Sequence, residues 1–169
     1  AGAFITKATA QLMRDLGSIQ SPQNAFILNI GLESLHVRMA KHSENGLAVA
    51  KALKENDKAL FVSYPGLESD KYHKLAEKYL PDGCSGVVSF EIKGGRKAAD
   101  EFMKKLKLIS IETHVADAKS CCLAPAITTH RQLTDEQLKE AGIPAGLIRL
   151  SLGLEDKEDL IDDILQALR

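Results

Sequence analysis

Short apolar runs with the periodicity of β-strands alternate along this chain with longer runs that have the periodicity of α-helices. The three strand-like runs are KALFVSYPG at 58–66, GVVSFEI at 86–92 and GLIRLSLG at 146–153. In the second run, Val88, Phe90 and Ile92 occupy every other position, which is the two-residue period of a half-buried strand. Because strands and helices mix within one stretch, the pattern predicts the α/β class, with a mixed sheet covered by helices on one side.

A long helical run precedes the first strand. Ser21 and Pro22 are typical of a helix start, and helix-compatible residues continue to Asn56. Such a length is unusual in globular proteins, so we expect a bend near Gly46, where the backbone has most freedom. A helix of this kind usually connects a large body to an appended domain. We therefore predict the end of a larger domain and its connecting helix at 1–45, and a C-terminal domain at 46–169.

The later helices are predicted from turns, caps and apolar stripes. Gly94 and Gly95 form a turn before a helix that reaches Leu106, and they lack the spacing of phosphate-binding glycine motifs. Thr134 and Gln137 have the spacing of a capping box. A helix capped by Ser69 is expected to have an apolar face formed by Tyr72, Leu75, Ala76 and Tyr79. The last helix is expected to bury Leu160, Ile161, Ile164, Leu165 and Leu168, and to leave Asp159, Asp162 and Asp163 outside.

The composition is that of a soluble globular protein. Of the 169 residues, 44% are hydrophobic and 27% are charged, and the net charge is -1. This balance does not indicate a nucleic-acid partner, and no apolar run approaches the roughly 20 residues that a membrane span requires. The odd number of thiols (Cys84, Cys121 and Cys122) favours a cytoplasmic location. The first 17 residues lack an initiator Met and read as helix, so we expect a piece of a longer protein.

The segment from Glu112 to His130 contains two cysteines and two histidines close together in the sequence. Their spacing does not match a metal site, because there is no C-x-x-C or H-x-x-x-H pattern and adjacent cysteines do not easily bind one tetrahedral ion. The prediction is therefore that the chain holds no metal. The functional alternative is a loop whose backbone donors and polar side chains line a binding site.

Arg149 lies in the middle of the third strand-like run. If the run is extended, Leu147, Arg149 and Ser151 point one way, and the apolar residues between them point the other way. A guanidinium remains charged at any accessible pH, so it requires an anionic or hydrogen-bonding partner. Two partners remain open: one of the 23 acidic residues of the chain, or the carboxylate of a ligand gripped by two parallel hydrogen bonds.

Five segments, in this order and spacing, resemble the C-terminal part of the Cys/Met-metabolism (trans-sulfuration) family of pyridoxal-phosphate (PLP) enzymes. They are SPQNAFILNIGLESLHVRMAKHSENG, YPGLESDKYHKLAEKYLP, VVSFEIKGG, VADAKSCCLAPAITTHRQLTDEQLKEAGI and GLIRLSLGLEDKEDLIDDILQAL. The resemblance is strongest to the O-acetylhomoserine sulfhydrylase branch. It implies the C-terminal, substrate-side domain of a fold type I PLP enzyme, one that replaces the acetate of O-acetylhomoserine with sulfide or methanethiol.

The resemblance also assigns the site. It implies that Arg149 binds the substrate α-carboxylate and that His114 stands in a substrate-facing position. The family's Schiff-base lysine motif does not occur here, so we expect no catalytic residue and no bound PLP in this piece, with PLP held by the complete enzyme. The expected partner is a small-molecule amino acid, and the complete enzyme is expected to be a homo-oligomer. The chain departs from the family pattern at Gln23, His114, Ala116 (for Gly) and Ala124 (for His).

Two alternatives remain open at this point. One is a cystathionine or methionine γ-lyase of the same family, which would share the arginine and differ in the second half-reaction. The other is a non-catalytic oligomerisation or binding module, since the chain has no lysine motif.

Overall fold

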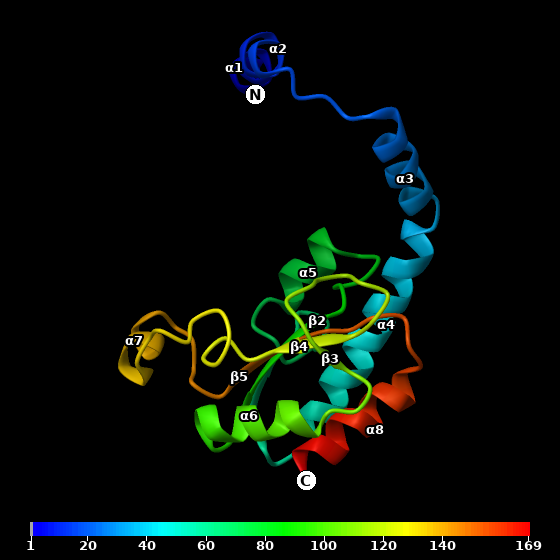
Figure 1. The fold of residues 1–169 in the computed structure, drawn as a ribbon. Helices are drawn as coiled ribbons and strands as arrows, with labels where there is room; N and C mark the ends of the chain where they lie inside the picture. Colours follow the sequence, from blue (N-terminus) through cyan, green and yellow to red (C-terminus); the bar gives the residue numbers. More distant parts are fainter. Residues whose placement is uncertain (1) are drawn as a thin grey trace. The chain divides into compact units, whose positions relative to one another are not determined.

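The computed structural model describes residues 2–169 (Figure 1). The chain divides into two compact units, one ending at His36 and the other running from Val37 to Arg169. The boundary predicted between residues 45 and 46 falls inside helix α4 (Leu35–Lys54), so that division stays a prediction. In the described part of the chain, no helix combines the length and apolar character needed to cross a membrane.

The first unit consists of helices without a buried face. They are α1 (Gly2–Lys7), the π-helix η1 (Ala8–Met13), α2 (Arg14–Leu16) and α3 (Pro22–Glu33). The predicted start of α3 is confirmed, because the Ser21 side chain accepts a hydrogen bond from the Asn24 amide and Pro22 is the first helical residue.

The long helical run is interrupted at a different place from the one predicted. α3 ends at Glu33, and φ is -103° and ψ is 2° at Ser34, which follows it. α4 begins at Leu35 and continues without a break through Gly46. The interruption of the run therefore lies at Ser34, and the bend predicted near Gly46 does not interrupt α4. A Cβ on Gly46 would lie 2.6 Å from the Ser85 carbonyl oxygen and 2.9 Å from the Tyr64 hydroxyl. The glycine thus permits close packing within a regular helix.

The second unit contains the predicted mixed sheet, and this sheet has five strands. Its strands are β1 (Ala59–Ser63), β2 (Val87–Ile92), β3 (Ser110–Ile111), β4 (Cys121–Leu123) and β5 (Leu147–Ser151). Their order across the sheet is β1-β2-β5-β4-β3, and every pair is antiparallel except β3 with β4. β5 is central, and Arg149 lies between Ser89 of β2 and Leu123 of β4.

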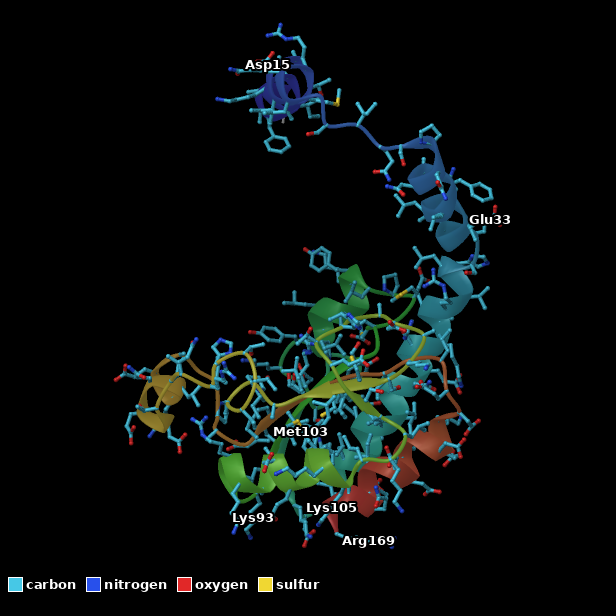
Figure 2. All side chains as sticks on the ribbon, viewed as in Figure 1. Asp15, Glu33, Lys93, Met103, Lys105 and Arg169 are labelled. Carbon is cyan, nitrogen blue, oxygen red and sulfur yellow. The ribbon has the colours of Figure 1, made fainter. Side chains whose placement is uncertain are left out.

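Helices α4, α6 (Gly95–Lys105) and α8 (Lys157–Leu168) lie together on one side of the sheet (Figure 1). The core forms between them and the sheet, with Phe90 of β2 packed edge-on against Phe102 of α6 at a centroid distance of 5.6 Å. Met103 points into this layer and is buried, whereas Lys105 projects to solvent (Figure 2). The remaining helices are α5 (His73–Tyr79) and α7 (Asp135–Glu140).

Two local expectations are corrected and one is confirmed. α5 begins at His73 with no side-chain cap, and only Ala76 of its expected apolar face is buried. Asp163 was expected on the solvent-exposed face of α8. It is only 6% exposed, because it accepts hydrogen bonds from the turn that follows α6. The capping box of α7 is present, since the side chains of Thr134 and Gln137 each bond the other's backbone amide.

Candidate functional site

β5 carries the candidate arginine on the side of the sheet opposite the helices. Ile148 and Leu150 are fully buried in the core, while Arg149 between them is half-buried. This is the alternation expected from the sequence, because successive side chains of a strand point to opposite faces. The central place of β5 in the sheet gives Arg149 a rigid support on both sides.

Arg149 is held by main-chain carbonyls. Its Nη2 donates to the carbonyl oxygens of Thr113 at 3.0 Å and His114 at 3.3 Å. Its Nε is buried and has no hydrogen-bond partner. Across residues 2–169, no carboxylate lies within 4.0 Å of this guanidinium. The internal ion pair left open by the sequence is thus not formed in the described chain, and the guanidinium has an unused donor.

His114 approaches Arg149 through its backbone. Its carbonyl oxygen accepts from Arg149 and also from the Cys121 thiol at 3.0 Å. Its ring is 64% exposed, with Nδ1 at 3.0 Å from Glu112 Oε2 and 4.0 Å from Asp117 Oδ2. The structure therefore brings the His114 carbonyl to the arginine, and it directs the imidazole towards two acidic side chains.

Ser151 is a further polar group at the site. Its Oγ accepts a hydrogen bond from the Ala116 amide at 3.1 Å, which ties the loop after β3 to β5. Ser151 was expected on the same face as Arg149, but no role was predicted for it. The carbonyl of Thr113 was missed altogether, because backbone groups carry no signal in the identity of a residue.

The cysteines show no sign of activation. Burial raises the pKa of the Cys122 thiol to about 12. Burial also raises the pKa of Cys121, although the nearby Arg149 charge acts in the opposite direction. All three thiols are free, and in the part of the chain that the structure describes no group of three or more potential ligands could hold a metal ion.

Comparisons with known proteins give consistent matches. The profile of the family described as Cys/Met metabolism PLP-dependent enzyme matches residues 2–169. The homocysteine synthase of Schizosaccharomyces pombe is 45% identical over 166 residues, covering 98% of this chain and 39% of that protein. The O-acetyl-L-homoserine sulfhydrylase of Leptospira meyeri is 45% identical over 168 residues, covering 99% and 38%. The cystathionine gamma-lyase of Bos taurus is 44% identical over 158 residues, covering 94% and 39%.

One solved structure extends the comparison to the fold. It is a putative O-acetylhomoserine (thiol)-lyase from Campylobacter jejuni, crystallised with N'-pyridoxyl-lysine-5'-monophosphate. Its TM-score with this chain is 0.87 at 41% identity, and the match covers 99% of this chain and 40% of that one. The chain thus spans about 39% of the length of the curated relatives that it matches.

Proposed function

Because the chain belongs to the Cys/Met metabolism family of PLP-dependent enzymes, we propose that it is the C-terminal, substrate-side portion of an O-acetylhomoserine sulfhydrylase-like transferase. In this proposal the complete enzyme replaces the acetate of O-acetylhomoserine with sulfide or methanethiol, giving homocysteine or methionine. The present chain contributes recognition of the substrate α-carboxylate through Arg149.

The observation that carries this proposal is the state of the Arg149 guanidinium. It is half-buried, it lacks an acidic partner among residues 2–169, and its Nε is an unsatisfied donor. A buried donor without a partner costs free energy until a ligand satisfies it. A carboxylate fits this guanidinium, because arginine presents parallel N–H groups to two oxygens. Two carbonyls already fix the side chain, so the orientation of a bound amino acid would be defined in advance.

The residues of this chain do not fit a covalently held PLP. The group forms a Schiff base with a lysine in a protected site, where it acts as an electron sink for the reacting substrate. In the described residues all lysines are exposed apart from Lys41 and Lys157, and both of these contact Glu44 instead. In the proposal, the group is held by polypeptide outside this chain.

A cystathionine γ-lyase is the second candidate, supported by the bovine relative at 44% identity. It would use the same arginine for the same carboxylate, so the arginine does not discriminate between the two activities. A cytoplasmic location and a homo-oligomeric complete enzyme belong to the same proposal. The three free thiols and the exposed apolar residues of the first unit support them.

The test is made in the complete protein. Two assays, O-acetylhomoserine plus sulfide and cystathionine cleavage, are run on the wild type, Arg149→Leu and Arg131→Leu. The last variant alters an exposed arginine and is the control. Loss of a charge-assisted contact worth roughly 1.5–3 kcal/mol should lower kcat/KM at least about tenfold in Arg149→Leu alone. Faster cystathionine cleavage would favour the second candidate. Unchanged kinetics in Arg149→Leu would overturn the role of Arg149.

A further inference from the structure

The loop between β3 and β4 runs alongside β5 and the turn that follows it, in the same direction. Successive residues of the loop contact successive residues of β5 and of the turn after it. Thr113 and His114 meet Arg149, the Ala116 amide meets Ser151, and the Leu154 amide donates to the Ala118 carbonyl at 2.9 Å. Residues 112–119 are exposed, so no buried side chain of the loop itself keeps it in this position.

Ser120 and Glu155 close the far end of this row of contacts. The Glu155 carboxylate accepts from the Ser120 amide at 2.6 Å and from its hydroxyl at 2.8 Å. The Ser120 hydroxyl oxygen in turn accepts from the Gly153 amide at 2.7 Å. Ser120 is 0% exposed and Glu155 is half-buried, so the two bonds to the carboxylate are partly buried and charge-assisted, and such bonds are stronger than neutral ones.

The turn that carries Glu155 is itself fixed from the helix layer. Asn45 of α4 donates through Nδ2 to the carbonyl oxygens of Gly153 and Glu155, both at 2.9 Å. His42, one turn earlier, contacts the Leu152 carbonyl oxygen through Nδ1 at 2.6 Å. The backbone of Glu155 is therefore held in place by α4, and its carboxylate in turn holds the end of the loop through Ser120.

We propose that Glu155 and Ser120 are positioning residues that hold the 113–120 loop on β5, so that its carbonyls aim the Arg149 guanidinium at a substrate carboxylate. This inference rests on the proposed role of Arg149. Neither residue is required to touch the substrate. Without this anchor, the exposed loop gains conformational freedom, and the carbonyls no longer define one orientation of Nη2. The loop must then be ordered when substrate binds, and this loss of conformational entropy weakens binding.

The experiment compares Glu155→Gln and Ser120→Ala with the control Glu158→Gln in the complete protein. Glu158 is an exposed acid three residues away, and its side chain forms no hydrogen bond or ion pair with the described loop. The first measurement is hydrogen exchange of the 113–119 amides, which should be faster in the two variants and unchanged in the control. The second is steady-state kinetics with O-acetylhomoserine and sulfide. The KM should rise about three- to tenfold while kcat changes less than about twofold, as expected for weakened ground-state and transition-state binding alike.

The outcomes separate the two proposals. Faster loop exchange together with a raised KM supports the positioning role. Unchanged exchange in both variants, or faster exchange with an unchanged KM, overturns it. If the wild type neither binds nor converts the amino acid, the proposed function fails and the positioning role for that carboxylate falls with it, whereas the exchange data still show whether Glu155 anchors the loop. If Glu155→Gln does not fold, Ser120→Ala decides, because it leaves the carboxylate in place.

Discussion

Ala116 adopts a backbone conformation that a residue with a side chain rarely takes. Its φ is +60°, and its amide is bonded to Ser151 within the loop that contacts Arg149. Left-handed geometry costs an L-residue about 1–2 kcal/mol. The resemblance implies Gly at this position, so alanine here keeps the turn in a strained conformation. At the scale of single residues, the contact with Ser151 thus holds Ala116 in a backbone conformation that alanine by itself disfavours.

Ala116→Gly should stabilise the protein slightly. Release of the strain is partly offset by the greater entropy of glycine in the unfolded chain, so we expect a gain of about 0.5 kcal/mol in the free energy of unfolding. Urea denaturation of the wild type and the variant measures it. Ala118→Gly in the same loop is the control, since Ala118 has no positive φ and should lose stability. Equal losses in both variants would contradict the strain at Ala116.

At the scale of secondary-structure elements, two helices depend on single residues that approach neighbouring segments closely. Gly46 lets α4 pack against Tyr64 and the backbone of Ser85. Asp163 connects α8 to the turn after α6, because its two carboxylate oxygens accept from the amides of Lys107, Leu108 and Ile109 at 2.8–3.0 Å. A glycine in the middle of a helix and a buried acid on a helix are both unusual. Contacts with another part of the chain explain both.

Gly46→Ala should destabilise the second unit although alanine is the better helix former. The added Cβ would meet Ser85 and Tyr64, and overpacking of this kind costs about 1–3 kcal/mol. Gly31→Ala in α3 is the matched control, because a Cβ there meets nothing within 4 Å. It should gain helicity, worth about 1 kcal/mol. Thermal unfolding and the circular dichroism at the helix band measure the two effects, and a stabilised Gly46→Ala would contradict the packing.

Asp163→Asn should destabilise the protein at neutral pH and much less in acid. Burial raises the pKa of Asp163, but the hydrogen bonds from Ile109, Lys107 and Leu108 outweigh it and lower the pKa below its ordinary 3.8. A carboxyl with a depressed folded-state pKa stabilises the fold above its unfolded pKa, and this stability is lost as the pH falls through the folded-state value.

The loss should be about 2 kcal/mol at pH 7, since hydrogen bonds to a charged group are removed, and it should shrink below about pH 3.8. Urea denaturation across this pH range measures it. Asp162→Asn changes an exposed neighbour and serves as the control. A difference between Asp163→Asn and wild type that stays constant with pH would contradict the role of the charge.

At the scale of the whole molecule, the first unit exposes many of its large apolar side chains. In α3 alone Phe26, Ile27, Leu28, Ile30 and Leu32 are all exposed, and no residue of the helix is buried. Figure 2 shows the side chains of this unit as sticks, with the acidic Asp15 and Glu33 among them. Exposed large apolar side chains in this number mark a region that binds other polypeptide or associates with itself.

The chain of residues 1–169 should therefore self-associate at micromolar concentration. Replacing Phe26 and Ile30 by Ser removes two large apolar side chains and should shift the population towards monomer. Sedimentation velocity over a concentration series measures this. The double variant Leu75→Ser and Tyr79→Ser changes exposed apolar residues of α5 and is the control. A monomeric wild type, or an equal effect of the control, would exclude α3 as the associating surface.

The sequence by itself determined the features that depend on near neighbours. The alternation in β2 and β5, the Ser21 cap and the Thr134 capping box were all predictable, because a strand or a cap is specified by residues two or three positions apart. The same alternation placed Arg149 on the face away from the core. The family resemblance, which is confirmed, came from the order of whole segments.

Only the tertiary structure decided which groups meet. Ser120 and Glu155 are 35 positions apart, and Arg149 lies as far from the carbonyl of His114 that holds it. The surroundings of Gly46 and Asp163 could not be predicted for the same reason: each owes its environment to a segment far away in the chain. Such contacts follow from how the sheet order brings β3, β4 and β5 together. Because a backbone carbonyl or a close approach leaves no mark on local residue identity, the partners of Arg149 become visible only when the chain is folded.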